Sequence, residues 1–518
     1  MVDFSNFYSK NLQNLFEGKI CLKLRDARSV TQALIICLNQ FNEYRFFMRP
    51  FSTFLFLCAM FLSYGGLKAA ATVPAAADVA DSIPGRWQYI SENMQTLPVD
   101  DRWWQTLGDC TLDSLIALGV ERNFNVLAAI HRIEASRQAI RQARAGYYPT
   151  VNLSGGWTKT RTSGDMNGIG RATTMSYWNV GADVNWEIDV FGRVKARAAQ
   201  AKARYRATRA EYAATMVSLC AEIARNYAAL RTAQAQLAVA RAHIESQDSV
   251  RHIAQARFEA ELASKLDVEQ ANTIYYSTIA TVPALEASAS TAINAIAMLI
   301  GEYPERVAAR LSKPGPMPQF DHPVAVGMPA ELLRRRPDII EAECQLAVAA
   351  QSIGIAKKEF LPTLSLNGSL GTSAHSAKDL FSDRSLSYTI APTLSWTLFD
   401  GMARKAALAE AREQMKASVD AYNMAILTAV QETDNAMASY NSAMKEAVLL
   451  EEVVVHARKA FELSFELYRS GLTSFTNVAD AQISFLQYAD SLAAAQGNAL
   501  AALVGLYEAL GGGWTEAI

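Results

Sequence analysis

The sequence repeats one pattern in its two halves, about 210 residues apart, and this duplication constrains the fold more than any single motif does. The segment RQARAGYYPTVNLSGG from Arg141 corresponds to GIAKKEFLPTLSLNGS from Gly354. Two further pairs follow in the same order: VNWEIDVFGR from Val184 with LSWTLFDGMAR from Leu394, and RFEAELASKLDVEQA from Arg257 with LYRSGLTSFTNVADA from Leu467. Each unit is far longer than an ordinary solenoid repeat, so we predict one architecture built from two similar halves.

Two segments without glycine or proline are long enough to form helices of unusual length. They run from residue 193 to 282 and from 402 to 470. At a rise of 1.5 Å per residue, about 68 helical residues reach about 100 Å, whereas globular helices average about three turns. Small residues recur at three- and four-residue steps, as at Ala196, Ala199 and Ala203. We therefore predict a supercoiled helical wall rather than an ordinary amphipathic bundle.

Four shorter segments alternate apolar and polar residues, which is typical of strands with two different faces. We predict strands over residues 150–160, 177–189, 363–373 and 386–398. Such segments match outer-membrane barrel strands, in which aromatic girdles lie at both membrane interfaces. The expected interface aromatics are Trp157, Trp178, Trp186, Tyr388 and Trp396. The alternative is a set of soluble hairpins packed on helices, but the long helices have their own seams to bury.

Four strands cannot close a membrane barrel, and every strand edge in lipid must be paired. The smallest closed membrane barrels have eight strands, so copies of the chain must share one barrel. Three chains with cyclic symmetry would supply twelve strands. We therefore expect a mixed α and β membrane protein: a homotrimer with a 12-stranded outer-membrane β-barrel, four strands per chain, continuous with a long α-helical barrel.

The duplication also divides the chain into regions. We expect an N-terminal region plus first repeat over residues 72–301 and a proline-rich linker over 302–328. The second repeat then covers residues 329–511, and a short tail covers 512–518.

The segment 48–71 has the layout of a secretory signal peptide, with a positive start at Arg49, an apolar run and a small-residue end. We expect cleavage to leave a mature chain that begins near Thr72. A permanent membrane anchor is the alternative, but the apolar run is too short for one. Residues 1–47 show no export pattern, so we expect them to be a leader absent from the precursor, with Met48 as the true start.

The cysteines indicate neither a lipid anchor nor a structural cross-link. Leu57 precedes Cys58 at a position where a lipidation site needs a small residue, so we expect no lipid there. After cleavage, Cys110, Cys220 and Cys344 remain, an odd and widely spaced set that indicates no disulfide framework. The six histidines are scattered, so no metal site is predicted with certainty.

Composition and motifs exclude several classes of function. The net charge of −2 and the lack of a basic block give no support for nucleic-acid binding. The sequence contains no nucleophile–base set, phosphate loop or metal cluster, so we expect neither an enzyme nor a cofactor. After residue 72 no run of about eighteen uncharged apolar residues occurs, so we expect no helical membrane span in the body of the protein.

The ordered motifs resemble those of the outer-membrane factor family, the TolC-like exit ducts, and the elements LGD and RRPD are similar to its OprM-like branch. The resemblance covers about residues 103–514. Each motif is weak alone, but most occur twice in the same order. They are WWQTLGDCTLDSLIALGVERNFNVLAA from Trp103, the strand entries YPTVNLSGG and LPTLSLNGS, LFDG at 398–401, the tips LDVEQA and NVADAQ, and the pair RNFNVLAA and RRPDIIEA.

This resemblance implies a trimeric exit duct in the outer membrane of a Gram-negative bacterium, with a large periplasmic tunnel. An inner-membrane transporter and a periplasmic adaptor (membrane-fusion) protein would dock at the tapered end, and small molecules such as drugs would be exported. The alternatives are a duct for protein or peptide secretion and a periplasmic coiled-coil adaptor or scaffold. A passive porin-like channel is a further alternative, but the long helical tunnel favours a coupled conduit.

The resemblance also places a channel gate where each long helix turns back, near 258–267 and 468–480. Gly471 interrupts the second helix, and Asp480 matches the constriction aspartate of the family. Asn477 replaces a second aspartate of that motif, and Tyr468 is expected to meet Asp267. The alternative is that both aspartates are ordinary solvated acids on helix faces.

Overall fold

The computed structural model describes residues 77–80, 82–165, 168, 170–318, 320 and 323–514, all within a unit that spans Val73–Ile518. The expected leader over 1–47, the signal peptide over 48–71 and the end of the tail lie outside the described residues.

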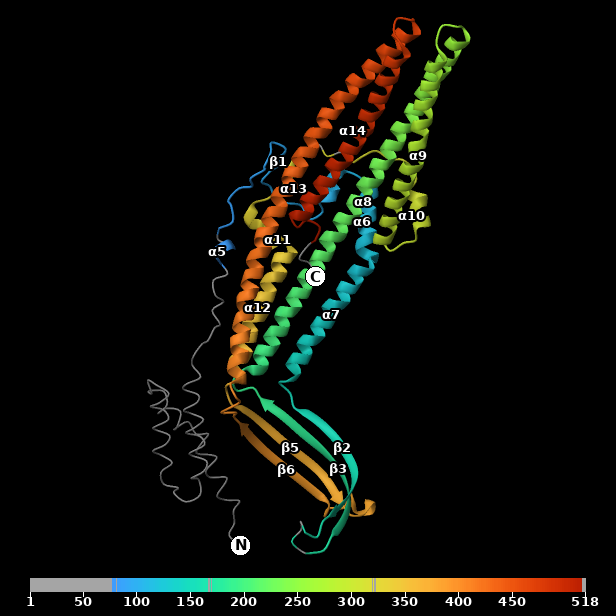
Figure 1. Ribbon diagram of the computed structural model, residues 1–518. Coiled ribbons are helices and arrows are strands. Elements are labelled where there is room, and N and C mark those ends of the chain that lie inside the picture. The colour runs from blue at the N-terminus through green and yellow to red at the C-terminus, as the bar shows by residue number, and fades with distance from the viewer. Residues whose placement is uncertain are drawn as a thin grey trace, which may run out of the picture. The chain divides into compact units, whose positions relative to one another are not determined.

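Two helical hairpins of equal dimensions dominate the described unit (Figure 1). Helices α8 (Arg193–Glu259) and α13 (Ala403–Arg469) each have 67 residues. The return helices α9 (Lys265–Leu299) and α14 (Phe475–Ala509) each have 35 residues. At 1.5 Å per residue each long helix reaches about 100 Å, so the predicted long helices and their return helices are confirmed.

Each hairpin turns through a residue with left-handed backbone. Gly471 has φ 76° and its amide donates to the Tyr468 carbonyl at 2.9 Å. The first hairpin places Glu261 at the same position with φ 58°, and its amide donates to Phe258 at 2.9 Å. Glycine normally occupies such a position because it carries no Cβ. Residues 193–282 contain no glycine or proline, but the segment is not one continuous helix, because it turns back at Glu261.

Shorter helices precede each pair of strands and pack beside the long helices in one layer. Helices α6 (Cys110–Arg122) and α7 (Phe124–Ala145) lead into the first pair, and α12 (Pro337–Lys358) leads into the second. Helix α7 packs along α8, and α12 packs along both α8 and α13. The side-by-side order is therefore α7, α8, α12 and α13.

Short elements surround the middle of the long helices, and two of them fall in the expected linker over 302–328. They are α5 (Ala77–Ala80), β1 (Met94–Gln95), η1 (Trp103–Leu107), α10 (Pro304–Leu311), β4 (Val324–Ala325), η2 (Pro329–Glu331) and α11 (Leu332–Arg335). Strand β1 pairs in parallel with β4, and Trp103 stacks on Tyr507 with ring centroids 5.0 Å apart. The segment 302–328 is thus partly ordered into elements rather than a plain linker.

Four long strands form an antiparallel sheet in the order β2-β3-β5-β6. They are β2 (Thr150–Thr162), β3 (Thr173–Ile188), β5 (Thr363–Ala374) and β6 (Leu386–Ser395), with η3 (Ala377–Asp379) between the last two. All four predicted strands are confirmed, with different ends. Strand β3 starts at Thr173 because β2 continues far enough to pair with it, and β6 stops at Ser395 because its partner β5 begins at Thr363.

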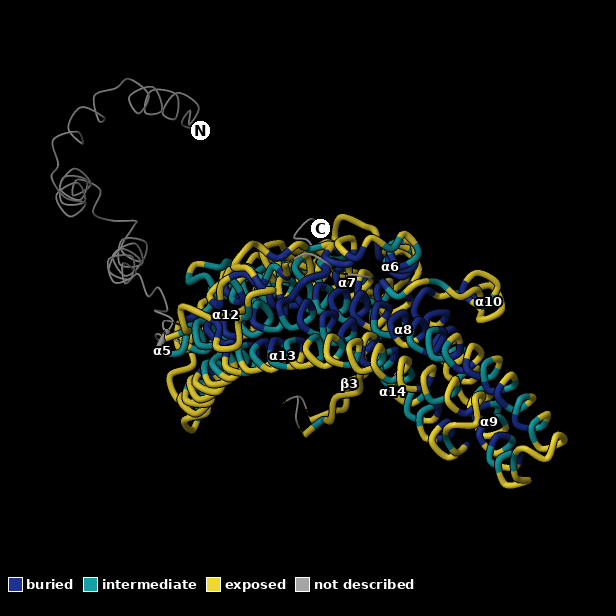
Figure 2. Tube along the Cα trace, turned by 90° about the horizontal axis from the view of Figure 1, so that it is seen from above, coloured by how far each residue is buried: buried dark blue, intermediate teal, exposed yellow. Residues whose placement is uncertain are grey.

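The largest hydrophobic core lies around the middle of the long helices. It includes Trp103, Ile116, Tyr227, Ile296 and Leu503, each at most 2% exposed. Figure 2 shows the buried residues gathered there, with exposed residues more frequent toward the far ends of the hairpins. A second, smaller core joins the two hairpins near their turns, and includes Val250, Ile274, Phe461, Phe475 and Val478.

Two helices satisfy a looser test for membrane spans. By length and composition alone, α9 and α12 could cross a membrane, with mean hydropathies of 1.3 and 1.2. Neither helix contains an unbroken apolar run, because polar residues such as Asn272 and Gln345 interrupt them. Both helices pack lengthwise on the neighbours described above. Hydropathy alone is therefore weak support for a span, and the expected absence of helical spans stays a prediction.

Candidate functional site

The sheet has one apolar face, which is set by the register of its strands. Residues that pair directly across antiparallel strands lie on the same face. One row runs Leu153, Ala182, Leu370 and Tyr388, and the next runs Val151, Val184, Gly368 and Ile390. Leu153 is 82% exposed and Ile390 is 72% exposed. A continuous exposed apolar face of this kind is what a lipid-facing barrel wall requires.

The opposite face of the same sheet is polar. A row there consists of Asn152, Asp183, Ser369 and Thr389. In a neighbouring row the side-chain amide of Asn185 donates to Asn367 Oδ1 at 2.7 Å. The alternation therefore separates an apolar surface from a hydrophilic one, as in a strand wall between lipid and an aqueous lumen.

Four of the five expected interface aromatics, the tryptophans, lie on the apolar face at two levels. Trp157 and Trp178 pair directly, with ring centroids 6.3 Å apart, at the end far from the helices. Trp186 and Trp396 lie at the helical end, where their indole N–H groups donate to the carbonyls of Tyr147 and Phe360, each at 3.0 Å. Eight residues separate Trp178 from Trp186, which is about 26 Å along the strand. For a barrel strand tilted by about 40° this is about 20 Å of height, which fits within an outer-membrane apolar band of about 25 Å.

Tyr388 pairs with Leu370 in the row of Ala182, midway along the strands between Trp178 and Trp186, and is 75% exposed. The structure thus brings all five predicted aromatics onto one face, with Tyr388 between the two tryptophan levels.

The outermost described strands of the sheet, β2 and β6, each have one neighbouring strand instead of two. Strand β2 pairs only with β3, and β6 pairs only with β5, among the residues that the structure describes. Both edge strands therefore present a row of backbone N–H and C=O groups along one side. Such edges need a partner in lipid, because no water is present to satisfy them.

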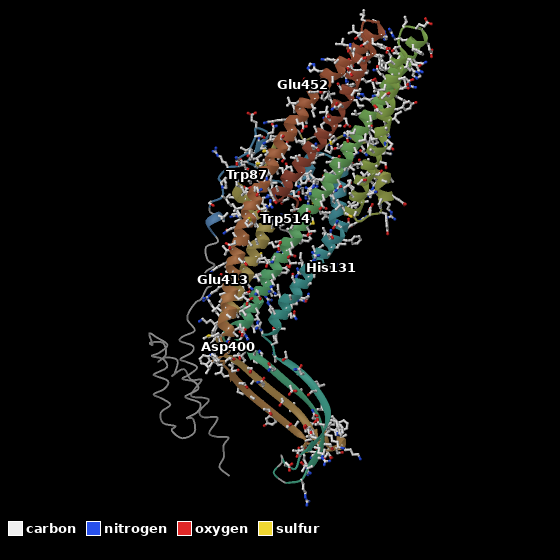
Figure 3. The ribbon with its side chains drawn as sticks, in the orientation of Figure 1. Trp87, His131, Asp400, Glu413, Glu452 and Trp514 are labelled. Atoms are coloured by element: carbon white, nitrogen blue, oxygen red, sulfur yellow. The ribbon has the colours of Figure 1, made fainter. Side chains whose placement is uncertain are left out.

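A repeated set of charged contacts joins the strands to the long helices. The Asp189 carboxylate accepts hydrogen bonds from the backbone amides of Val194 and Lys195, at the start of α8. Asp400, which lies at the junction in Figure 3, accepts from Arg404 Nε at 2.6 Å at the start of α13. Hydrogen bonds from Arg404 lower the pKa of the Asp400 carboxyl. The backbone amide of Arg404 also donates to Asp400 Oδ2 at 3.2 Å. In both repeats an acid between the strand and the long helix thus caps the first turn of that helix.

A cavity of about 720 Å³ lies between α7, α8, α12 and α13 near this junction. Two arginines and two glutamates line it, together with glutamine and alanine side chains. Arg197 lies 3.5 Å from the Glu359 carboxylate across the cavity wall. The mixed charge suits a wetted wall better than an apolar binding pocket, and the described residues contain no group of three or more potential metal ligands.

At the hairpin turns, the structure brings Tyr468 and Asp267 together. The Tyr468 hydroxyl lies 3.3 Å from Asp267 Oδ2, which is long for a hydrogen bond between oxygens. Tyr468 is 3% exposed, and its pKa is raised by burial and by Asp267. The phenol is therefore a proton donor at neutral pH, and the expected contact between the two hairpins is present.

The other residues expected at the gate lie on exposed positions of the second hairpin. Gly471 is in the turn, and Asn477 and Asp480 are exposed on α14. The Asn477 side-chain amide donates to Thr473 Oγ1 at 2.7 Å. No contact links Asp480 to Tyr468 or Asp267 among the described residues, so the structure does not bring these acids into one cluster.

Sequence reasoning missed three residues in this region, Arg257, His243 and Gln247. Arg257 contacts the end of α13, while His243 and Gln247 are buried between the hairpins at 5% and 1% exposure. The sequence marks Arg257 only as a difference between the repeats, because its counterpart is Leu467, and this difference does not indicate which group Arg257 contacts.

We expect His243 to make this part of the protein sensitive to acid. Burial and the nearby Arg458 lower its pKa from 6.5 to about 4, and its ring lies 4.5 Å from that of Phe485. The unfolded chain binds a proton below pH 6.5 that the folded protein excludes. Stability should therefore fall as pH drops from 6.5 toward 4, by up to about 3 kcal/mol.

Thermal unfolding followed by circular dichroism at pH 7.5 and 4.5 measures this dependence. The His243→Leu variant should lose less stability on acidification than the wild type. His131, exposed on α7 and labelled in Figure 3, provides the control variant His131→Gln, which should keep the wild-type dependence. Equal acid sensitivity in the His243→Leu variant and the wild type would contradict the assignment.

A sheet with one lipid-compatible face, continuous with long helical hairpins, defines a channel subunit of the outer-membrane class. The comparisons agree. The family model described as "Outer membrane efflux protein" matches residues 115–302 and 328–512. The chain is 30% identical over 460 residues to outer membrane protein OprJ of Pseudomonas aeruginosa, which covers 88% of this chain and 95% of that protein.

Two further comparisons support the same assignment. The solvent efflux pump outer membrane protein SrpC of Pseudomonas putida is 30% identical over 408 residues, with 79% of this chain and 86% of that protein covered. The structure of the outer-membrane channel OprN superposes with a TM-score of 0.79 at 29% identity, covering 84% of this chain and 97% of that chain. The chain belongs to the outer membrane efflux protein family. It is an outer-membrane exit duct, a transport component of an efflux system.

Proposed function

We propose that three copies of the chain close a 12-stranded barrel in the outer membrane, with their helical hairpins forming one periplasmic tunnel. The observation that carries this proposal is the four-stranded sheet with an exposed apolar face and two unpaired edges. A neighbouring copy supplies β6 for the free side of β2, and threefold symmetry closes the ring. In this barrel the polar face of each four-stranded sheet lines the lumen, and the apolar face meets lipid.

The duct exports small apolar molecules such as drugs and solvents, together with an inner-membrane pump and a periplasmic adaptor. The relative SrpC is named for a solvent efflux pump, which supports this class of cargo. We assign the N-terminal region plus the first repeat to residues 72–301, the proline-rich linker to 302–328, the second repeat to 329–511 and the tail to 512–518. The hairpin turns face the partner proteins.

The gate of this duct lies at the same turns. Tyr468 and Asp267 hold the two hairpins of each chain together, and a hydrogen bond of this kind to a charged group contributes on the order of 1–3 kcal/mol. The Asp480 side chains of the three chains form one ring of carboxylates around the trimer axis. Because position 477 is an asparagine and not an aspartate, no second carboxylate ring forms beside it. Gly471 provides the turn that carries α14 inward.

Deletion of the gene tests the exported cargo. Cells without the protein should accumulate a fluorescent apolar drug and become more sensitive to organic solvent, and the wild-type gene should restore both. A deletion strain that handles drugs and solvents normally, but fails to secrete a protein or peptide, would assign the duct to secretion instead.

A further inference from the structure

The last turn of α8 carries an arginine that reaches across to the second hairpin. Arg257 Nη1 donates to the carbonyl oxygen of Arg469 at 2.9 Å. Arg469 is the final residue of α13, where helix carbonyls lack partners within the helix. A cation at this position also interacts favourably with the negative end of the helix dipole. Arg257 therefore caps a helix that belongs to the other repeat.

The same guanidinium group also lies against Tyr468. Its central carbon is 4.9 Å from the centroid of the Tyr468 ring, within the range of a cation–π interaction. Phe475 also contacts this ring, edge to face with centroids 5.3 Å apart. Tyr468 thus contacts an arginine of the first hairpin and a phenylalanine of its own hairpin.

The acceptor of the Tyr468 hydroxyl is itself fixed within the first hairpin. Asp267 is in the first turn of α9, and the Ser264 hydroxyl donates to Asp267 Oδ1 at 2.6 Å. Oδ2 remains for the Tyr468 hydroxyl at 3.3 Å. The cation over the Tyr468 ring, Arg257, and the carboxylate at its hydroxyl, Asp267, therefore both come from the first hairpin.

We propose that Arg257 is the positioning residue of the gate, which sets Tyr468 against Asp267 and so holds the second hairpin onto the first. This inference rests on the proposed gate at the hairpin turns. These contacts cannot form a second time with the roles of the two hairpins exchanged. The residues at the corresponding positions of the other repeat lack the required groups: Leu467 for Arg257, Phe258 for Tyr468 and Asn477 for Asp267. Each chain therefore forms one such set of contacts between its hairpins.

Single-channel recording in planar bilayers tests the inference on purified full-length protein. Arg257→Met should raise the resting open probability by about tenfold, which corresponds to about 1.4 kcal/mol. Arg257→Lys keeps a cation over the ring and should restore most of the closed state. Because Arg257 acts through Tyr468, adding Tyr468→Phe to Arg257→Met should raise the open probability no further.

Arg251 provides a matched control on the same helix. It pairs with Asp248 and lies 4.9 Å from the centroid of the Tyr275 ring, so all its contacts stay within the first hairpin. Arg251→Met should leave the resting open probability unchanged. If Tyr468→Phe opens the channel and Arg257→Met does not, the inference is wrong while the gate stands. If neither variant opens a channel that inserts normally, the proposed gate itself is wrong.

Discussion

Arginine in place of Ile390 should prevent the protein from assembling in the outer membrane, whereas arginine at the adjacent Thr389 should be tolerated. Ile390 lies near the middle of β6 on the apolar face, and Thr389 lies on the polar face. A lipid-facing arginine at the bilayer midplane costs about 2–4 kcal/mol, and each trimer would carry three of them. A lumen-facing arginine stays hydrated.

Chemical crosslinking of outer-membrane fractions in mild detergent measures this difference. The wild type and Thr389→Arg should give a ladder that stops at three chains, and Ile390→Arg should give little trimer. Equal amounts of trimer for the two arginine variants would show that the apolar face does not meet lipid. A wild-type ladder that stops at one chain would refute the shared barrel.

Removing the carboxylate of Asp480 should relieve block of the channel by divalent cations. In the proposed trimer three such groups face one axis, and rings of carboxylates concentrate cations in narrow pores. A single carboxylate about 4 Å from a divalent ion contributes about 2 kcal/mol in water. Asp480→Ala should therefore raise the blocking concentration by at least about tenfold.

Conductance in planar bilayers, titrated with a divalent salt from the side of the helical tunnel, gives the blocking concentration. Glu452→Ala is the matched control, since Glu452 is exposed on α13 about 24 Å from Tyr468 by helix rise (Figure 3). The control should be blocked like the wild type. Unchanged block in Asp480→Ala, or an equal change in both variants, would remove Asp480 from the constriction.

Much of the fold could be predicted because both repeats carry the same local signals. The alternation through Leu366 and Leu370 predicts a strand as clearly as that through Val151 and Leu153, and the two copies support each other. The turn at Glu261 could not be predicted from local composition, since glutamate rarely adopts a positive φ. Only its alignment with Gly471 in the other repeat indicated a break.

The site was less predictable, because its contacts join segments about 200 residues apart. The pairing of Tyr468 with Asp267 followed from resemblance to a family, and the structure contains that contact. Nothing in the sequence indicates that Arg257 reaches the carbonyl of Arg469, because a backbone acceptor has no residue signature. The burial of His243 depends on how the two hairpins pack, which periodicity within one helix does not specify.

Because the two hairpins have equal lengths, both of their turns are available to the same kind of partner molecule, and one chain can bind one or two such partners. Both turns expose a leucine at the same position, Leu262 and Leu472, so a partner that recognises this shared feature meets two quasi-equivalent docking points per chain. A partner that recognises Arg257, whose counterpart in the second repeat is Leu467, meets one such point per chain. In a trimer these alternatives correspond to pseudo-sixfold and threefold rings, so the stoichiometry of the assembled pump reports which surface its adaptor recognises.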